Sequence, residues 1–247
     1  AIVDAGIDME RPIWDDPAVD WKSFDLVLIR TTWDYQEKQQ DFNAWAERIS
    51  VETRLVNPVN VVVWNTAKTY LRDLERVGAP LTPTKWLDQG TQVDIQAMMQ
   101  GLGWTRGFLK PVVGATARET LPFDCSPESL EKAQAHLDRL LPDESMMLQP
   151  FLASVMEEGE YSAIFFGGEF SHGVQKIPVA GDYRVQDDFG ATDKPHTFNE
   201  SDYETVQQIE KSLLRLVKER FDGVALTYAR VDMIRDAEGK LRLNELE

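Results

Sequence analysis

Two hydrophobic periods alternate along the chain and predict both helices and strands. Apolar residues recur at the 3.6-residue spacing of an amphipathic helix in five segments, over residues 36–49, 66–77, 92–100, 126–141 and 202–220. Short apolar runs between polar or turn residues predict strands over residues 24–30, 107–111, 146–149, 160–166, 169–176, 230–234 and 241–247, and one more that ends near Leu121. This mixture predicts a fold of the α/β and α+β classes.

The order of these segments divides the chain into three parts. Strand and helix alternate through residues 1–66, which predicts an N-terminal α/β domain. Residues 67–150 read as a linking helix and a small α+β lobe, and residues 151–247 as a mostly antiparallel β domain with helices. Residues 1–6 read as the end of a helix, so we expect a first strand upstream of the printed sequence.

Composition narrows the classes of function. The chain has 247 residues, of which 43% are hydrophobic and 28% charged, as in ordinary globular proteins. A net charge of -16 argues against nucleic acid as a partner, because binding to phosphate backbones needs a surplus of Lys and Arg. No apolar run is long enough to cross a bilayer, so no membrane partner is expected. The single cysteine, Cys125, fits a reducing compartment, and the sequence therefore predicts a cytoplasmic protein.

The C-terminal hairpin gathers carboxylates. Alternation along the two strands places Glu245 and Glu247 on one face, with Asp232 on the partner strand. Neighbouring carboxylates repel one another, and Mg²⁺ is commonly held by one or two carboxylates together with substrate phosphates. The alternative is an edge strand whose glutamates point into water.

Cations lie in two further segments. Lys110 ends an apolar strand, where an ammonium group is costly to bury without an anion, and the Val112–Arg118 turn offers backbone N–H groups for a phosphate. Lys176 and Arg184 flank a Pro/Gly bend and could face one ligand. The alternatives are a Lys110 that reaches the surface and a local pair of Asp182 with Arg184. Lys68 is most simply a solvated charge on a helix.

Taken in order, these segments resemble the ATP-grasp superfamily, near glutathione synthetase and the ribosomal-protein glutamate ligases. The resemblance covers residues 60–247 and rests on these motifs: Lys68, Phe-Leu-Lys110-Pro, Gln149-Pro-Phe151-Leu152, Gly-Glu160-Tyr-Ser, Lys176-Ile-Pro, Gly-Asp182-Tyr-Arg184, Val-Asp232-Met-Ile and Asn-Glu245-Leu-Glu247. The branch that contains the cyclo-ligase of cycloserine biosynthesis looks most similar, through residues 30–35, Trp64-Asn65 and the terminal E-x-E. The resemblance implies an N-terminal domain, a lid lobe and a C-terminal domain, with ATP between the last two.

The same resemblance implies a role for each matching residue. Lys68 and Lys110 would approach the ATP phosphates, under a loop around Gly114. Gln149, Phe151 and Leu152 would meet adenine, largely through backbone groups, and Glu160, or alternatively Glu157, would hold the ribose. Arg184 and Lys176 would be catalytic, with Arg184 facing the γ-phosphate and the substrate carboxylate. Asp232, Glu245 and Glu247 would hold Mg²⁺, as two ions, with Mn²⁺ as an alternative metal, although many relatives carry Asn in place of Glu247.

The implied activity is an ATP- and Mg²⁺-dependent ligase, which activates a carboxylate as an acyl phosphate and joins it to an amine or similar nucleophile. The alternatives are a small-molecule kinase and a nucleotide-binding protein without turnover. Arg30, Trp33, Asp34 and Tyr35 follow the first strand and either line the substrate cleft or are core aromatics beside an Arg30–Asp34 pair. Small carboxylate and amine substrates are the expected partners, and a homo-oligomer is compatible with the family.

Overall fold

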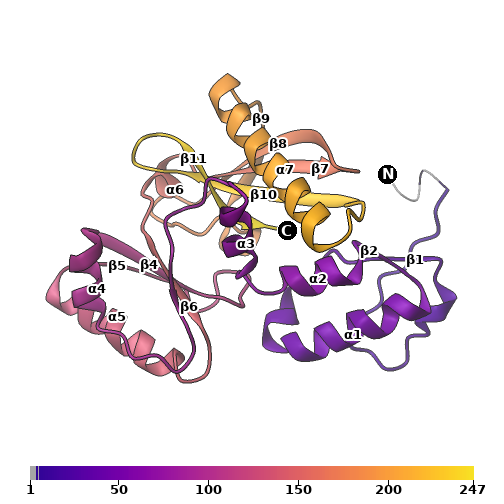
Figure 1. The fold of residues 1–247 in the computed structure, drawn as a ribbon, viewed down its shortest axis with the longest axis horizontal. Helices are drawn as coiled ribbons and strands as arrows, with labels where there is room; N and C mark the ends of the chain where they lie inside the picture. Colours follow the sequence, from indigo (N-terminus) through magenta and orange to yellow (C-terminus); the bar gives the residue numbers. More distant parts are fainter. Residues whose placement is uncertain (1–3, 5) are drawn as a thin grey trace.

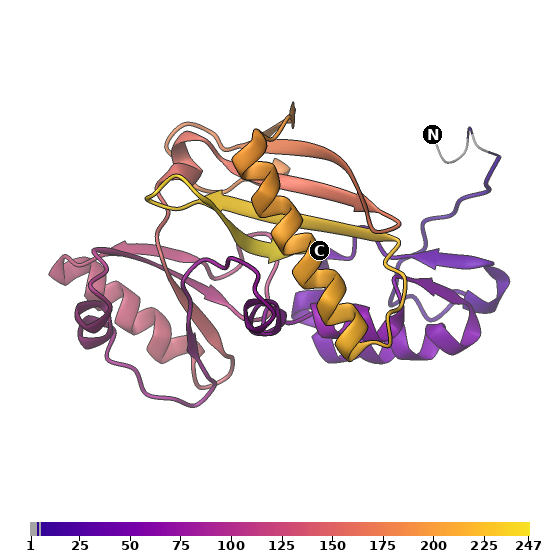
Figure 2. The same ribbon diagram turned by 45° about the horizontal axis from the view of Figure 1, so that its top comes forward.

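In the computed structural model, which describes residue 4 and residues 6–247, the chain forms three separate sheets, and its C-terminus lies between them (Figure 1). A two-stranded sheet lies in the N-terminal part, a four-stranded sheet in the middle of the chain and a five-stranded sheet in the C-terminal part. Figure 2 shows the same arrangement after a rotation, with the C-terminus again between the three parts. The site described below lies where these parts meet.

The N-terminal part pairs β1 (Leu26–Leu28) in parallel with β2 (Arg54–Val56) and packs α1 (Gln39–Glu52) against them. The helix was predicted from its apolar spacing, and the structure buries the four residues that defined it, Phe42, Trp45, Ala46 and Ile49. Two 3₁₀ turns, η2 (Trp21–Ser23) and η3 (Trp33–Glu37), complete this part.

One prediction about the N-terminal sheet is wrong. The strand over residues 24–30 was expected to be buried, yet Leu26 and Leu28 are 45% and 41% exposed. Among the described residues β1 pairs with β2 alone, so only the face that carries Val27 meets the aromatic cluster around Trp21 and Trp45. The predicted helix end over residues 1–6 lies largely outside the described residues.

The middle lobe is an antiparallel sheet in the order β3-β6-β4-β5, covered by two helices. Its elements are β3 (Lys85–Leu87), α4 (Ile95–Leu102), β4 (Arg106–Pro111), β5 (Leu121–Asp124), α5 (Pro127–Leu140) and β6 (Met146–Pro150). Asp94 caps α4 by accepting a hydrogen bond from the Ala97 amide, as N-cap carboxylates commonly do. The strand expected to end near Leu121 instead begins there, because residues 114–120 form the turn between β4 and β5.

The C-terminal part is an antiparallel sheet in the order β11-β10-β7-β8-β9. Its elements are α6 (Ser154–Glu157), β7 (Glu160–Phe166), β8 (Glu169–Ile177), the 3₁₀ turn η4 (Asp187–Phe189), β9 (Thr192–His196), α7 (Glu200–Arg220), β10 (Tyr228–Arg235) and β11 (Leu241–Leu246). The predicted β7–β8 hairpin is confirmed, and Gly167 and Gly168 have φ of 62° and 83°, the left-handed pair of a tight hairpin turn.

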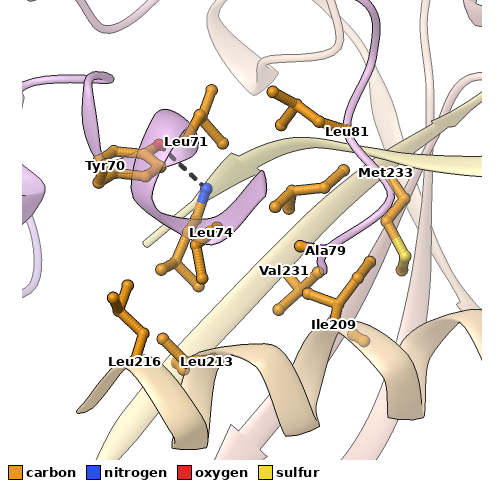
Figure 3. Close-up of a cluster of buried hydrophobic side chains, with 14 of the residues drawn as sticks. Tyr70, Leu71, Leu74, Ala79, Leu81, Ile209, Leu213, Leu216, Val231 and Met233 are labelled. Atoms are coloured by element: carbon orange, nitrogen blue, oxygen red, sulfur yellow. Dashed lines mark hydrogen bonds between the residues drawn. The ribbon is translucent and has the colours of Figure 1, made fainter. Parts of the chain in front are cut away.

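The largest core lies between α7 and this sheet, and α3 closes it (Figure 3). The helix predicted over residues 66–77 is confirmed as α3 (Tyr70–Arg76), which begins four residues later, and a further short helix, α2 (Val59–Asn65), precedes it without having been predicted. Leu71 and Leu74 of α3 are fully buried against α7, and the Leu246 amide donates to the Tyr70 hydroxyl at 3.0 Å. This packing fixes the turn before α3, which carries Lys68, against the end of β11.

No helix in the described part of the chain combines the length and the apolar character that a bilayer crossing requires.

Asn57 fastens the N-terminal part to the C-terminal sheet. Its side-chain amide donates to the Tyr228 carbonyl at 2.8 Å, and its carbonyl oxygen accepts from the Thr227 amide at 2.8 Å. We expect Asn57→Ala to lower the free energy of unfolding by about 1–3 kcal/mol, because partly buried backbone groups lose their partners. Asn60→Ala is the control, since exposed Asn60 bonds only the neighbouring Val61 amide. Urea titrations of both variants check this, and equal midpoints would refute the role of Asn57.

Candidate active site

Two adjoining cavities meet at the C-terminal strand. The first, of about 310 Å³, lies between the middle lobe and the five-stranded sheet, and the second, of about 280 Å³, lies between residues 28–35 and the C-terminal hairpin. We call them the first and the second cavity. Their common wall consists of six residues that line both: Trp33, Lys68, Ala115, Arg230, Glu245 and Glu247.

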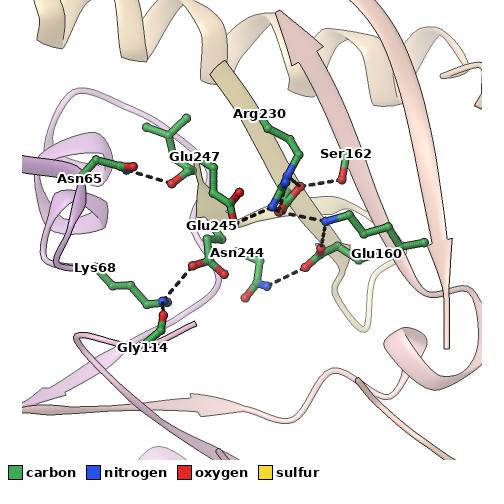
Figure 4. Close-up of polar contacts among 12 residues, drawn as sticks. Asn65, Lys68, Gly114, Glu160, Ser162, Arg230, Asn244, Glu245 and Glu247 are labelled. Atoms are coloured by element: carbon green, nitrogen blue, oxygen red, sulfur yellow. Dashed lines mark hydrogen bonds and ion pairs between the residues drawn. The ribbon is translucent and has the colours of Figure 1, made fainter. Parts of the chain in front are cut away.

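The predicted hairpin of carboxylates is confirmed, and its carboxylates form ion pairs with cationic side chains (Figure 4). Asp232 on β10 stands directly opposite Glu245 on β11, and backbone hydrogen bonds of 2.6 and 2.8 Å pair Glu247 with Arg230. The Arg230 guanidinium binds both Asp232, at 2.9 Å, and Glu247, at 2.6 Å. The alternative of a solvated edge strand holds only in part: β11 is the edge strand and Glu247 is 47% exposed, but both glutamates pair with cationic side chains.

The charges of this wall shift one another's pKa values. Burial alone would raise the pKa of Asp232, but Arg230 and Lys176 outweigh it and hold that pKa well below its usual range. Burial also opposes ionisation of Glu245, yet Lys68 and Lys110 keep its pKa below the ordinary value. Burial raises the pKa of Glu247 to about 7, since Arg230 only partly compensates it. The neighbouring cations therefore keep Asp232 and Glu245 ionised despite their burial, whereas at Glu247 burial outweighs the attraction of Arg230.

Lys68 is not the solvated helix charge that its sequence context suggested. It lies in the turn between α2 and α3 and is 7% exposed. Its ammonium group contacts Glu245 at 2.8 Å and donates to the Gly114 carbonyl, while its own amide donates to Val112 at 2.8 Å. Lys68 thus joins the loop after β4 to the carboxylate hairpin.

Lys110 does not reach the surface, contrary to the alternative considered from the sequence. It is 5% exposed and donates to Asn244 Oδ1 at 3.0 Å, and burial lowers its pKa to about 8 despite the attraction of Glu245. A buried ammonium group with one neutral partner is poised to accept an anionic ligand from the first cavity.

Lys176 and Glu160 are brought together by the close approach of β7 and β8. Gly159 has φ of 86°, and a Cβ there would lie 1.9 Å from the Lys176 carbonyl, so only glycine fits. Lys176 consequently contacts Glu160 at 3.0 Å and Asp232 at 3.2 Å, and Asn244 donates to the other Glu160 oxygen. Glu160 faces the first cavity, whereas Glu157 lies exposed on α6 outside it, which favours Glu160 over its rival.

Aromatic side chains form the other end of the first cavity. Phe108 lies 6.3 Å from Phe151 and 5.5 Å from Tyr183, ring centre to ring centre, and Leu152 lines the same end. Gln149 was expected to meet adenine largely through its backbone, and its side chain donates to Thr84 at 2.9 Å without lining the cavity. Because side chains alternate along β6, that of Gln149 points to the face of the sheet away from the cavity.

Arg184 lines the first cavity. It also forms the local ion pair with Asp182, which was the alternative interpretation of this segment. Its guanidinium contacts the Asp182 carboxylate at 2.6 Å and lies 3.9 Å from the centre of the Phe189 ring. The two interpretations of this segment are therefore compatible, because the ion pair orients the guanidinium without removing it from the cavity.

Residues 30–35 divide between the second cavity and the N-terminal core. Arg30, Trp33 and Tyr35 line the second cavity, with the Arg30 guanidinium 4.8 Å from the centre of the Tyr228 ring. Asp34 lines neither cavity and accepts from Trp14 Nε1 at 3.0 Å, not from Arg30. Trp33 is 60% exposed, so it is no core aromatic.

The sequence patterns did not indicate that Arg230, Asn244 and Gln36 belong to the site. Arg230 and Asp232 alternate along β10 and share a face, so the spacing could have revealed the arginine. Asn244 precedes Glu245 and would by alternation face the other way, and a β-bulge between Asp232 and Met233 alters the register there. Gln36 gave no signal, because its partner lies 79 residues away.

The carboxylates of the first cavity fit a magnesium ion only in part. Across residue 4 and residues 6–247, no group of three or more His, Cys, Asp or Glu side chains is arranged to hold a metal. Carboxylates of Asp232, Glu245 and Glu247 nevertheless line one cavity, and Mg²⁺ often takes one or two carboxylates and completes its shell with water and phosphates. These residues are therefore suited to a metal that arrives with a nucleotide.

Similarity to known proteins extends over nearly the whole chain. Residues 1–57 match the family model for the N-terminal domain of D-cycloserine synthetase DcsG. The cycloserine biosynthesis protein DcsG of Streptomyces lavendulae is 31% identical over 250 residues, which cover 98% of this chain and 81% of that protein.

Solved structures agree with the sequence matches. A crystal structure of D-cycloserine synthetase DcsG aligns with a TM-score of 0.85 and 29% identity, over 99% of this chain and 82% of that one. The D-alanine–D-alanine ligase of Coxiella burnetii shares the fold at 19% identity, with a TM-score of 0.60 over 91% of this chain and 59% of its own. By its sequence and its fold, the chain belongs to the D-cycloserine synthetase family, and it shares the fold of ATP-grasp ligases.

Proposed function

We propose that this protein binds ATP in the first cavity and a small amino-acid-like carboxylate in the second, and that it joins this carboxylate to an amine or similar nucleophile. The observation that carries the proposal is the common wall. Lys68, Arg230, Glu245 and Glu247 face both cavities, so a phosphoryl donor and a carboxylate acceptor can meet across them.

The cations of the first cavity suit phosphoryl transfer. A carboxylate oxygen would attack the γ-phosphorus, the bond to the β-phosphate oxygen would break, and ADP would leave. Lys68, Lys110 and Arg184 are positioned to neutralise charge on the phosphates, and Arg230 can contact both the transferred group and the carboxylate. The nucleophile would then attack the acyl carbon and release phosphate.

The remaining roles follow the geometry. Phe108, Phe151, Leu152 and Tyr183 offer an apolar slot for adenine, and Glu160, which lines the same cavity, would hold the ribose hydroxyls. Asp232, Glu245 and Glu247 would hold Mg²⁺, as one ion or two, or Mn²⁺ in its place. The metal, when bound, supplies charge neutralisation at the transferring phosphoryl group.

The second cavity supports a substrate that contains both reacting groups. Arg30 lies at this cavity together with the aromatic side chains of Tyr35, Trp64 and Tyr70, which suits a small zwitterion. D-Cycloserine, for which the relative is named, is a ring compound. We therefore propose ring closure within one amino-acid-derived molecule.

Thermal unfolding with Mg²⁺ and the β,γ-imido analogue of ATP tests the nucleotide site. At a hundred times the dissociation constant, binding adds about 2.7 kcal/mol to stability, which corresponds to roughly 5–10 °C in a protein of this size. We expect Lys176→Ala to lose most of this shift. Lys194→Ala, an exposed lysine of the neighbouring strand β9, should keep it. A wild type without any shift would refute the proposed nucleotide site.

Product analysis separates ligation from the alternative activities. The protein is incubated with ATP, Mg²⁺ and amino acids that carry a second nucleophile in the side chain, and phosphate release is measured. A ring-closing ligase releases free phosphate and a product lighter than the substrate by one water. A phosphorylated product without free phosphate would instead indicate a kinase, and nucleotide binding with no turnover of any substrate would indicate a binding protein.

A further inference from the structure

The peptide unit between Gly114 and Ala115 is held from both sides. Its carbonyl accepts a hydrogen bond from the Lys68 ammonium group, and its N–H donates to the side-chain oxygen of Gln36. The same oxygen would lie 3.8 Å from a Cβ at Gly114, so the glutamine side chain packs closely along the backbone here. Two side chains from outside the middle lobe thus fix the orientation of one peptide plane in the wall of the first cavity.

The segment after this peptide unit adopts a conformation that needs such support. Thr116, Ala117 and Glu119 have φ of 51°, 56° and 50°, in the left-handed region that residues other than glycine rarely occupy. Strained backbone of this kind persists where surrounding contacts determine it. Arg118 and Glu119 are tied to the middle lobe itself, through Glu144 and Arg139. Lys68 and Gln36 supply contacts from the rest of the molecule.

Gln36 connects this loop to the second cavity. It lies in η3 next to Tyr35, which lines that cavity, and η3 is fastened by the hydrogen bond from Trp14 to Asp34. Ala115, which Gln36 holds, belongs to the common wall. A single hydrogen bond therefore links the wall of the substrate cavity to the loop over the proposed phosphate site.

We infer that Gln36 is a positioning residue, which holds the loop 114–120 from the side of the second cavity in the conformation that receives the ATP phosphates. The inference rests on the proposed nucleotide site and goes beyond it, because Gln36 itself touches neither the proposed phosphates nor the metal ligands. Its side chain acts through the Gly114–Ala115 peptide unit.

Hydrogen exchange and nucleotide binding test the inference together. Gln36→Ala should speed amide exchange in peptides that cover residues 114–120 of the nucleotide-free protein and leave the core of α7 unchanged. It should also raise the dissociation constant of the β,γ-imido ATP analogue with Mg²⁺ by about 3- to 10-fold, the effect of one lost hydrogen bond. Gln36→Glu, which keeps an acceptor oxygen, should retain the exchange protection.

Two further variants separate positioning from general damage. Gln39→Ala is the matched control, because Gln39 donates to Thr66 at 3.0 Å and does not contact the loop. It should leave both readouts unchanged. Ala117→Gly removes strain at φ of 56°, so in the Gln36→Ala background it should recover at least half of the lost affinity on a logarithmic scale.

The outcomes are distinct. Unchanged exchange and affinity in Gln36→Ala would overturn the inference, as would faster exchange spread over the whole N-terminal part, which indicates a merely structural role. Tighter nucleotide binding would overturn it too, since Gln36 would then compete with phosphate for the Ala115 amide. A wild type that does not bind the analogue would refute the proposed function. Faster amide exchange confined to residues 114–120 in Gln36→Ala would still show that Gln36 positions the loop.

Discussion

Glu245→Gln should abolish ligation and destabilise the nucleotide-free protein at the same time. Glu245 neutralises Lys68, whose side chain is only 8% exposed, so the variant leaves a buried ammonium group without an anion. Breaking such a pair typically costs 3–5 kcal/mol, and we expect about 2–4 kcal/mol because the amide oxygen still accepts a hydrogen bond. Loss of a proposed metal ligand should lower turnover by at least about 10³-fold, the equivalent of several kcal/mol at the transition state.

A double-mutant cycle separates the two effects. Lys68→Met in the Glu245→Gln background removes the unpaired charge and should restore most of the stability, while turnover stays lost. Unfolding by urea and phosphate release measure the two quantities. Glu238→Gln, in the exposed turn of the same hairpin, is the control and should change neither. If the double variant were no more stable than Glu245→Gln, the buried pair would not be the cause.

Lys110→Met should have the opposite effect on stability and the same effect on activity. Burial lowers the pKa of Lys110 from 10.5 to about 8, which corresponds to about 3 kcal/mol of destabilisation at neutral pH, since each unit is worth 1.36 kcal/mol. Methionine fills similar space without the charge but loses the bond to Asn244, so we expect a gain of about 1–3 kcal/mol. Nucleotide turnover should fall by at least about 10²-fold.

The pH dependence gives a second signature of Lys110. Between pH 8 and 10.5 the unfolded wild type binds more protons at this residue than the folded one, so wild-type stability gains a contribution that rises with pH in this window. The gain of Lys110→Met over the wild type should therefore be largest below pH 8 and fade towards pH 10.5. Lys85→Met, an exposed lysine of β3, should show no such trend. A gain that is independent of pH would contradict the buried charge as its origin.

The sequence predicted best the elements whose side chains meet a single large core. The apolar positions of α7 face one layer, so the helical period survives in the sequence. The β7–β8 hairpin was predicted from two short runs and the glycine pair between them, since β7 is buried from Glu160 to Phe165 without alternation. By contrast, β9 is mostly exposed and contains a proline, and it exists because β8 offers it an edge to pair with. The exposure of Leu26 and Leu28 likewise depends on which strands pair with β1, a tertiary fact that no local pattern records.

The residues of the candidate site likewise divide into those that the sequence could predict and those that it could not. Charged residues at strand positions, such as Lys110 and Asp232, could be predicted because a charge in an apolar run needs a partner. Lys68 could not be recognised as buried, because its burial comes from the docking of α3 on α7 and from a loop 46 residues away. The side chain of Gln149 turns towards Thr84, which shows that a motif can fix a position in the chain without fixing the direction of its side chain.

Ion pairs at and beside the common wall occupy Lys68, Lys176 and Arg230 with the protein's own carboxylates, while Lys110 has only a neutral partner. A metal alone would have to displace these cations, and a nucleotide alone would draw them away and leave the carboxylates uncompensated. When both ligands bind, the metal pairs with the carboxylates and the phosphates pair with the cationic side chains. Each of these charges then keeps a partner of opposite sign. Metal and nucleotide should therefore each raise the affinity of the other by an equal factor, as reciprocal linkage requires.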